Sequence, residues 1–332
     1  MLETSLINFA CTNCNGDLYI SKIHNFYDDR IKDGTITCKS CSNNYKVSNY
    51  IPRFVSNENY AKGFGYQWKK HIKTQYDSYN GLNLSKDRFY NSTLWPSNLS
   101  GEIILEVGAG AGRFTEIASS TNATVVSLDY SEAVEANYSM NGAKNNIIIA
   151  QGDIYKMPFR KHYFDKIFCF GVLQHTPDVK KAFMSLPAFL KPEGQLVVDI
   201  YKKTIVSTLF STKYYVRPFL CKKNPKQLYK FVKMYVDLMW PFVSLIAKIP
   251  KFGKGINSRL LVAEYSNYGL CHEMLKEMAY LDTFDMLSPE YDTPQTKKTI
   301  MSWFKEARLE NIDVSYGYNG IVGRGKTSLR NF

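Results

Sequence analysis

Short apolar segments alternate with helical patterns through the middle of the chain. The first apolar segment, residues 103–107, runs into a glycine-rich turn and then into a helical pattern over residues 114–118. Four more apolar segments begin at Thr124, Ile147, Asp165 and Gln195. Strands that alternate with helices favour a parallel, doubly wound sheet. The pattern therefore predicts an α/β fold centred on residues 101–200.

A different pattern follows this region. From Lys226 to Asp237 the polar residues recur every three to four positions, and apolar and aromatic residues fill the intervals as far as Trp240. This spacing predicts a helix with a narrow basic stripe and a wide apolar arc. Such a helix has to bury most of its surface, so we consider a lid over a binding pocket, a dimer interface and a membrane surface. Further on, residues 297–308 predict a helix, and residues 312–316 and 321–322 predict a strand pair.

The net charge of the chain is concentrated in one segment. The 332 residues include 42 Lys and Arg against 30 Asp and Glu, which gives a net charge of +12. Residues 201–260 hold thirteen Lys and Arg against one acid, Asp237, so this segment carries the whole excess. A balanced chain with one basic segment is not a general nucleic-acid binder. The charge instead favours an anionic ligand, or an anionic membrane surface that contacts residues 201–260.

Composition and targeting features give an expectation for the compartment. The first residues lack a basic region followed by a long apolar stretch, so we expect no secretory signal. The apolar run over residues 238–247 is shorter than the roughly 20 residues that span a bilayer. Seven cysteines, two pairs of which are closely spaced, argue against a disulfide scaffold. We therefore expect a cytoplasmic protein, with peripheral contact at the inner membrane surface as a further option.

Four of the cysteines form two CxxC pairs near the N-terminus, separated by about two dozen residues. Each tight turn presents two thiolates to one ion, and tetrahedral zinc takes four. Short alternating stretches between the pairs are typical of a zinc ribbon, while a redox pair or a chance spacing are the alternatives. We expect residues 1–55 to form a ribbon around a structural Zn²⁺ with four ligands: Cys11, Cys14, Cys38 and Cys41.

The glycine-rich turn indicates a ligand. It has the spacing Gly108-x-Gly110-x-Gly112, with Glu106 just before it. Glycines permit a tight turn and let a ligand approach the backbone at a helix N-terminus. The second and third apolar segments are followed by Asp129 and Asp153, and a carboxylate at such a strand end can accept hydrogen bonds from ribose hydroxyls. Each acid alone could be a solvated turn residue, but together they predict a nucleotide site.

These motifs together resemble those of class I S-adenosylmethionine-dependent methyltransferases. Five motifs in register between residues 100 and 200 carry the resemblance, among them the Glu106 turn, Asp129, Asp153 and the segment 165–178. The resemblance implies an α/β, Rossmann-like seven-stranded sheet with helices on both faces, an N-terminal zinc ribbon and a helical insertion after the fifth strand. We expect five parts: the ribbon at 1–55, an aromatic helical linker covering the cofactor at 56–100, the cofactor-binding core at 101–200, the basic helical insertion at 201–285, and the end of the sheet at 286–332.

The resemblance also implies residue roles around the cofactor. Glu106 and the glycine turn are expected to hold the methionine end, Asp129 the ribose, and Asp153 with Ile154 the adenine. The turn at Phe170 and Gly171 is expected to line the cofactor and the transferred methyl group. A helix before the core often covers the cofactor in this family, which places Trp68, or its neighbours Tyr66 and Gln67, at the site.

Acceptor and catalytic residues are expected outside the glycine turn. His175 follows the fourth strand and is the candidate general base, with a backbone-bonded structural histidine as the alternative. The stretch from Leu281 to Thr296 is rich in acids, Tyr and Pro, and we expect it to be a loop that reads the acceptor. Its candidate substrate contacts are four side chains: Asp282, Asp285, Tyr291 and Asp292.

The expected function is methyl transfer from S-adenosyl-L-methionine to oxygen or nitrogen of a small-molecule or glycan-type, anionic acceptor. A phosphate-linked or lipid-linked sugar fits this description. The alternative is an RNA methyltransferase that grips nucleic acid through its zinc ribbon. Residues 1–41 have no basic excess, so nucleic acid is not the expected partner. The acceptor, the methylated atom and the oligomeric state are not determined by the sequence.

Overall fold

The core of the protein is one large mixed β-sheet. In the computed structural model, which describes residues 1–55, 61–204, 211–250 and 252–329, eleven strands form this sheet in the order β1-β2-β3-β4-β7-β6-β5-β8-β9-β11-β10. The five central strands, in the order β7, β6, β5, β8 and β9, run parallel to one another, as predicted. Their bounds are β5 Ile103–Val107, β6 Thr124–Asp129, β7 Ile147–Gln151, β8 Phe164–Phe170 and β9 Leu190–Ile200.

The sheet is larger than expected from the sequence. A sheet of seven strands was predicted, and the structure has eleven among the described residues. The hairpin of β10 (Glu310–Gly317) and β11 (Gly320–Lys326) pairs with β9, as the predicted strand pair implies. The difference arises at the other edge, where β4 of the N-terminal module pairs with β7 and joins its own strands to the sheet.

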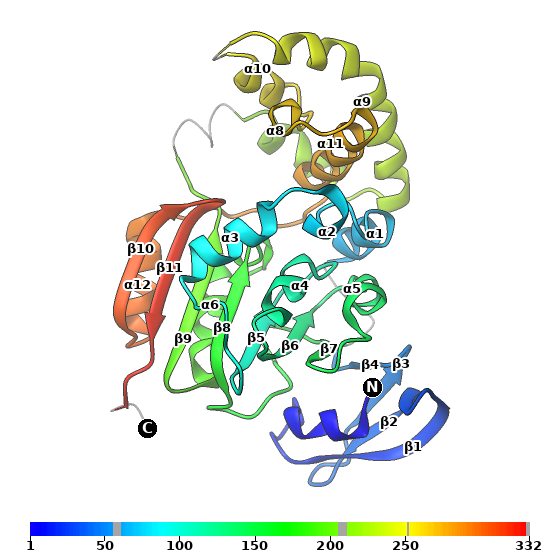
Figure 1. Ribbon diagram of the computed structural model, residues 1–332, viewed down its shortest axis with the longest axis vertical. Coiled ribbons are helices and arrows are strands. Elements are labelled where there is room, and N and C mark those ends of the chain that lie inside the picture. The colour runs from blue at the N-terminus through cyan, green and yellow to red at the C-terminus, as the bar shows by residue number, and fades with distance from the viewer. Residues whose placement is uncertain (56–60, 205–210, 251, 330–332) are drawn as a thin grey trace.

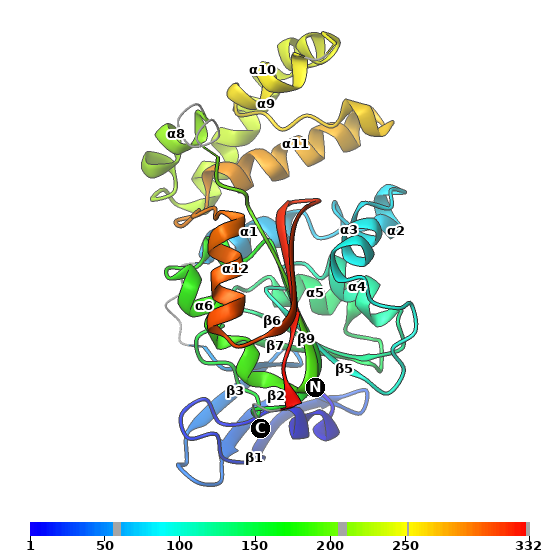
Figure 2. The same ribbon diagram turned by 90° about the vertical axis from the view of Figure 1, so that its left-hand side faces the viewer.

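Helices cover both faces of the sheet (Figures 1 and 2). On one face Ile104, Phe168 and their neighbours pack against helices α3 (Leu84–Thr93) and α4 (Arg113–Ser119). The next residues along the strands, such as Leu105 and Ile167, point to the opposite face and pack with α6 (Val179–Ser185) and α12 (Lys297–Glu306). This alternation follows from the two-residue period of a strand. Helix α5 (Val134–Asn141) and the short helices η2 (Leu173–His175) and η3 (Pro187–Phe189) complete the core.

The N-terminal module packs directly against the core. It consists of η1 (Glu3–Asn8), β1 (Leu18–Tyr27), β2 (Arg30–Cys38), β3 (Asn44–Ser48) and β4 (Ile51–Arg53). The ring of Phe9 packs on Phe54 and on Phe159 of the core, with centroids 5.2 and 5.8 Å apart. The Phe54 backbone N–H also donates to the Gln151 carbonyl at 2.7 Å. These apolar and backbone contacts make the module a continuation of the sheet.

A helical subdomain occupies the opposite end of the molecule (Figures 1 and 2). It contains α8 (Lys213–Leu220), α9 (Pro225–Ala247), α10 (Gly253–Arg259), η4 (Ser266–Tyr268) and α11 (His272–Leu287). Helix α1 (Lys62–Lys70) contacts both α9 and α11 and connects this subdomain to the core. Helix α2 (Asp77–Asn80) follows α1 in the chain.

One expectation about this subdomain was wrong. Asp282 and Asp285 were expected on a loop, but they lie in α11, because Leu281, Phe284 and Leu287 give the segment a buried helical face. Helix α9, for which a lid, a dimer interface and a membrane surface were considered, leaves several of its large apolar side chains exposed in the single chain. In the described part of the chain, no helix is long and apolar enough to cross a membrane. Within the basic segment, residues 205–210 and 251 lie outside the described residues, as do residues 56–60 of the linker.

Candidate functional site

A cavity of about 550 Å³ lies at the carboxyl ends of β5, β6 and β8. This is the edge of a doubly wound sheet where ligands generally bind. One side of the cavity is formed by the glycine turn after β5, and the other by side chains of α1, α3 and α11. A smaller cavity of about 160 Å³ lies near Arg30 and Tyr138, away from the glycine turn.

The glycine turn has a backbone conformation that glycine adopts without strain and other residues do not. Gly108, Gly110 and Gly112 all have positive φ, at 79°, 56° and 93°. A Cβ on Gly108 would overlap the side chain of Val172, and a Cβ on Gly112 would overlap Asn137. A Cβ on Gly110 would lie 3.0 Å from the indole nitrogen of Trp68. The turn therefore has its bare backbone against the cavity, as a ligand cradle requires.

Asp129 is held beside this turn. One carboxylate oxygen accepts from the Gly110 backbone N–H at 2.8 Å, and the other accepts from the backbone and hydroxyl of Ser131, both at 2.7 Å. Burial raises the pKa of Asp129, while these hydrogen bonds act in the opposite direction. Asp129 lines the cavity together with the next residue, Tyr130. The carboxylate is thus oriented towards a ligand that occupies the glycine cradle.

Glu106 lies behind the turn and does not line the cavity. Its side chain is 2% exposed, and one oxygen accepts from Thr115 at 2.5 Å and from Ser127 at 3.2 Å. The other oxygen has no hydrogen-bond partner among the described residues. Burial raises the pKa of Glu106 to about 8, against the effect of the two hydrogen bonds. Its contact with a cofactor remains a prediction.

The expected adenine contacts lie outside the cavity lining. Asp153 accepts from the backbone N–H of Tyr155 at 2.9 Å, and Ile154 is buried in the main apolar core. Phe170 and Gly171, in contrast, do line the cavity, and so does Trp68. Of the neighbours named with Trp68, Gln67 lines the cavity, whereas Tyr66 packs into the helical subdomain.

His175 lines the cavity with a defined tautomer. Its Nδ1 is 2.8 Å from the backbone carbonyl oxygen of Tyr291. A carbonyl oxygen only accepts, so Nδ1 carries a proton, and in the neutral ring Nε2 keeps its lone pair. The ring is held by Tyr201, at 5.4 Å and perpendicular, and by Phe64, at 5.3 Å. The alternative to a general base was a structural histidine that bonds the backbone. His175 does bond the backbone, but this hydrogen bond uses only one of its two ring nitrogens.

Two carboxyl groups of α11 face the same cavity. Asp282 accepts from Gln75 at 3.3 Å and from the hydroxyl of Tyr265, and Asp285 accepts from Gln67 at 3.3 Å. Burial raises the pKa of Asp282 to about 7, and the charge of Asp285 contributes to the shift. Burial also raises the pKa of Asp285. One α-helical turn places both groups on one side of α11, although the sequence suggested a loop.

The other two candidate substrate residues are placed differently. Asp292 forms ion pairs with Lys213, at 2.8 Å, and with Arg217, and it does not line the cavity. Burial acts to raise the pKa of Asp292, but the two cations outweigh it and hold that pKa below its ordinary range. Tyr291 contributes its backbone carbonyl to His175, and its side chain is not part of the lining.

Several cavity residues had no motif to indicate them. Arg88 of α3 donates two hydrogen bonds to Asp199 at 2.8 and 2.9 Å, and both arginine and acid are buried. Arg113 opens α4 directly after the glycine turn, and burial lowers its pKa to about 10, so it remains charged at neutral pH. Tyr130 could have been found as the neighbour of Asp129. Arg88 and Tyr201 could not, because their elements meet the site only after folding.

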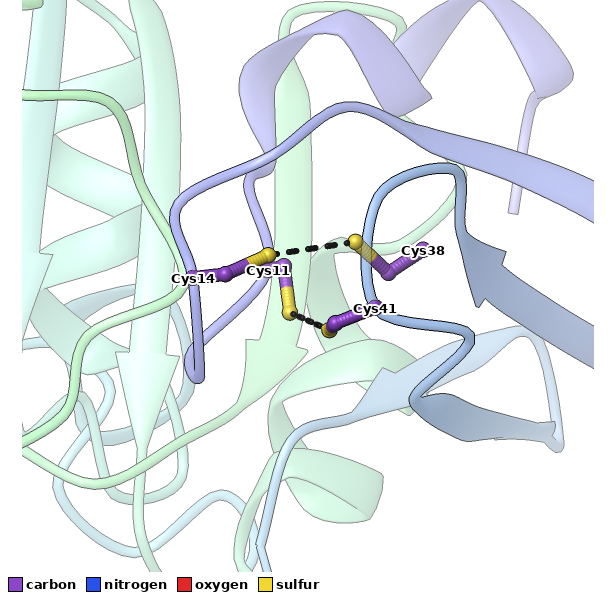
Figure 3. A group of neighbouring side chains, drawn as sticks. All are labelled: Cys11, Cys14, Cys38 and Cys41. Atoms are coloured by element: carbon purple, nitrogen blue, oxygen red, sulfur yellow. Dashed lines mark hydrogen bonds between the residues drawn. The ribbon is translucent and has the colours of Figure 1, made fainter.

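The four N-terminal cysteines form a cluster (Figure 3). Their sulfur atoms lie within 4.8 Å of one another, and the Cys11–Cys41 and Cys14–Cys38 distances are both 3.5 Å. These separations are too long for a disulfide and close to the edge of a tetrahedron of thiolates about 2.3 Å from zinc. Backbone N–H groups of Asn13 and Ser40 donate to the sulfurs of Cys11 and Cys38 at 3.4 Å. The arrangement fits a four-thiolate metal site.

Comparison with known proteins identifies the core. Residues 105–198 match the family described as Methyltransferase domain. A ubiquinone biosynthesis O-methyltransferase of Pseudomonas fluorescens is 28% identical over 120 residues, which are 34% of this chain and 50% of that protein. The protein of that name from Coxiella burnetii is 28% identical over 116 residues, 34% of this chain and 49% of its own. The chain thus spans about half the length of the curated relatives it matches.

Solved structures show a weaker likeness. A candidate S-adenosylmethionine-dependent methyltransferase of Methanococcus maripaludis is 14% identical, with 83% of this chain and 97% of that chain covered and a TM-score of 0.45. An O-methyltransferase family protein from Burkholderia thailandensis is 8% identical, covers 76% and 59%, and has a TM-score of 0.44. At these TM-scores the likeness supports no further conclusion.

The family match covers the parallel strands and the glycine turn that build one side of the cavity. This region is a class I S-adenosylmethionine-dependent methyltransferase domain in a methyltransferase-like α/β fold.

Proposed function

We propose that the protein transfers a methyl group from S-adenosylmethionine to a hydroxyl group of a small-molecule or glycan-type acceptor. One observation carries the proposal. The glycine turn and Asp129 share a single cavity with His175, whose Nε2 has its lone pair free in the neutral ring. Relatives named O-methyltransferases support oxygen as the methylated atom.

The residues fit the cofactor at one side of the cavity. The turn from Gly108 to Gly112 has the close-approach backbone that a ligand needs, and Asp129 is oriented beside it for ribose hydroxyls. Arg113 is charged, lines the cavity and has no ion pair among the described residues, so it suits the carboxylate of the methionine end. S-adenosylmethionine, when bound, supplies an electrophilic methyl group on a positively charged sulfur.

The other side of the cavity would orient the acceptor. His175 Nε2 would accept the proton of the acceptor hydroxyl as its oxygen is methylated, and bound S-adenosylmethionine would supply the methyl group and leave as S-adenosylhomocysteine. Gln67, Asp282 and Asp285 offer hydrogen-bond partners for further hydroxyl or amino groups of the acceptor. Alignment of the hydroxyl with the methyl carbon is worth several kcal/mol of the barrier, about 7 or more in well-oriented reactions.

The basic segment does not supply charge to the cavity. The anionic acceptor was inferred from the basic segment, residues 201–260, but no described Lys or Arg of this segment lines the cavity. Lys213 and Arg217 are engaged with Asp292. The acceptor side instead has two carboxyl groups, which favour a neutral, hydroxyl-rich acceptor over an anionic one. The acceptor that fits this lining is a small-molecule or glycan-type compound without a negative charge.

The RNA alternative gains no specific support. Residues 1–41 contain four Lys and Arg against five acids. One of these cations, Arg30, donates to the Gly142 carbonyl of the core, and one of the acids, Asp17, pairs with Arg160 of the core at 2.7 Å. RNA binding through this module would need an exposed basic surface with aromatic side chains.

We further propose that the cysteine cluster holds a structural Zn²⁺. All four thiolates are used, so no ligand position is open for catalysis. The hydroxyl of Tyr45, 3.1 Å from the Cys11 sulfur, and the two backbone N–H groups would support the ligands from outside. Metal analysis of the purified protein should find about one zinc per chain, and the Cys38→Ser variant should lose it; a protein without metal contradicts the site.

Titration calorimetry with S-adenosylmethionine tests the enzyme proposal directly. Binding with one site per chain is expected, together with product inhibition by S-adenosylhomocysteine. Turnover is then sought with a panel of neutral, anionic and cationic hydroxyl compounds, using release of S-adenosylhomocysteine as the readout. A purified, folded protein that shows no heat of binding would remove the cofactor, and with it the proposed reaction.

A further inference from the structure

Helix α9 presents two apolar faces, and one of them is exposed. Its outer face carries large apolar side chains at intervals of three and four residues, which places them in one stripe along the helix. Met234, Leu238 and Leu245 are each more than 60% exposed. The complete stripe, including the residue just after the helix, is Phe231, Met234, Leu238, Phe242, Leu245 and Ile249.

The inner face of α9 already supplies what folding requires. Leu228, Val232, Val236, Trp240 and Val243 are at most 8% exposed and pack against α11 and the segment after α10. The Asn257 side chain also donates to the Val243 carbonyl at 3.0 Å, which ties α10 to α9. The helix is therefore held in place by one face, and the outer stripe is not needed for its packing. Contiguous exposed apolar surface of this kind marks an interaction site.

The charge of the surroundings identifies the partner. Lys230, Lys233 and Lys248 each directly precede a stripe residue, so they flank the stripe along one side of the helix. They are exposed and have no ion pair with an acid among the described residues, and neither does Lys226 one turn earlier. Residues 201–260 as a whole carry the net +12 of the chain. This surface is complementary to one that is both apolar and anionic.

A second copy of the chain does not meet this requirement. In a two-fold symmetric dimer a patch contacts the same patch of its partner, so the lysines that flank the stripe in one copy would meet the same lysines of the other. Only Asp237 offers an opposite charge in this segment, and it is already paired with Lys276 at 2.5 Å. Nor does α9 act as the wall of the cavity, since none of the described lining residues belongs to it.

We propose that α9 and its basic neighbours bind the surface of an anionic lipid bilayer, with the apolar stripe at the boundary between headgroups and acyl chains. An amphipathic helix with lysines beside an apolar stripe lies in the plane of the interface. Each lysine near an anionic surface strengthens binding by about a factor of five, and salt screens this effect. The binding is reversible and does not depend on the methyl-transfer reaction.

Vesicle co-sedimentation of the full chain tests the proposal. Vesicles of phosphatidylcholine with about 30% phosphatidylglycerol should bind at least about tenfold more tightly than phosphatidylcholine alone, and about 0.5 M NaCl should abolish the difference. Two variants separate the contributions. Leu238→Asn with Leu245→Asn removes apolar contact, and Lys230→Glu with Lys233→Glu reverses charge; each should weaken binding by about tenfold or more.

A matched control changes exposed aromatic residues at the opposite end of the molecule. Phe26 and Tyr27 lie at the tip of the β1–β2 hairpin and are 58% and 69% exposed, so Phe26→Asn with Tyr27→Asn should leave vesicle binding within about twofold of the parent. Equal affinity for neutral and anionic vesicles, or unchanged binding by both α9 variants, overturns the proposal. So does a dimer in sedimentation velocity that the Leu238→Asn, Leu245→Asn variant converts to a monomer, because the stripe is then covered by a second copy.

Discussion

The two sides of the cavity are built in different ways. The side assigned to the cofactor consists mainly of backbone: the turn in which Gly108, Gly110 and Gly112 have positive φ, with Asp129 anchored to the Gly110 N–H. The side assigned to the acceptor consists of side chains from elements far apart in the chain, such as Gln67, His175 and Asp285. A backbone cradle tolerates almost no substitution, whereas a wall of side chains can change its chemistry without changing the fold. The family match covers the glycine turn, Asp129 and His175, but it does not include Gln67 or Asp285.

The largest expected effect comes from the backbone side. Gly108→Ala places a Cβ against Val172 at a φ of 79°, which an L-residue adopts only with strain of about 1–3 kcal/mol. Binding of S-adenosylmethionine should weaken by about 100-fold or more, as measured by calorimetry. The double variant Gly108→Ala with Val172→Ala removes the two closest contacts, at 2.2 and 2.7 Å, but keeps the Cβ of residue 172 at 2.9 Å and the backbone strain, so it should recover only part of the affinity. Full affinity in the single variant would show that the turn does not hold the cofactor.

Replacement of His175 tests the proposed general base on the acceptor side of the cavity. His175→Ala should lower kcat by about 100-fold with the affinity for S-adenosylmethionine unchanged, because a general base contributes about that factor. His175→Asn keeps a donor for the Tyr291 carbonyl but has no base, so it should be as slow as the alanine variant. Recovery of activity in the asparagine variant would assign His175 a positioning role.

Trp68 links the two sides and should have an intermediate effect. Its indole nitrogen sits over Gly110, so Trp68→Ala opens the cover of the glycine turn. We expect about tenfold weaker binding of S-adenosylmethionine, since an aromatic contact contributes about 1 kcal/mol or slightly more. Trp68→Phe keeps an aromatic cover and should stay within about threefold of the parent. An alanine variant that binds as tightly as the parent places Trp68 outside the cofactor site.

The smallest expected effect is a pH dependence on the acceptor side. Burial, with the charge of Asp285 as a second cause, raises the pKa of Asp282 to about 7, whereas the unfolded chain has an ordinary value near 4. The folded state binds this proton more tightly, so the contribution of Asp282 to stability is present below about pH 4 and is lost as the pH rises through about 7. Asp282→Asn should therefore show a smaller fall in Tm between about pH 5 and 8, by a few degrees.

The control for this prediction is a carboxyl group whose pKa is lowered and not raised by its surroundings. The Asp17 carboxylate accepts a hydrogen bond from Arg160, which lowers its pKa, so Asp17→Asn should not reduce the fall in Tm over the same pH range. A parallel shift of the whole Tm curve in Asp282→Asn, without a change in its slope, would mean that Asp282 is ionised in the folded protein at all these pH values.

The local sequence was enough to predict the glycine turn and Asp129 on the cofactor side of the cavity. Glycines at fixed spacing and acids at strand ends interact mainly with residues near them in the chain, so their placement follows from local geometry. Trp68, Phe170, Gly171, Asp129 and two glycines of the turn, Gly108 and Gly110, line the cavity, whereas Gly112 lies against Asn137 and is not part of the lining. Asp153, Ile154 and Glu106 do not line it either, because their side chains turn to backbone, core and hydroxyl partners instead.

The site contacts that the sequence did not indicate join residues far apart in the chain. Arg88 reaches Asp199 across 111 residues, and His175 bonds the Tyr291 carbonyl across 116. No periodicity encodes such pairs, since they exist only once the sheet has been assembled. The acids of α11 illustrate the same point, because tertiary packing of Leu281, Phe284 and Leu287 made a helix of a segment whose composition suggested a loop.

The sequence by itself determined the α/β core, the nucleotide-type turn and the two CxxC pairs, because each depends on short-range periodicity or spacing. Only the tertiary structure decided that the N-terminal module extends the sheet, that the carboxyl groups of α11 share one cavity with His175, and that α9 leaves an apolar stripe in solvent. The physical reason is the same in each case. Which face of an element is covered depends on what packs against it, and that partner comes from elsewhere in the chain or from outside it.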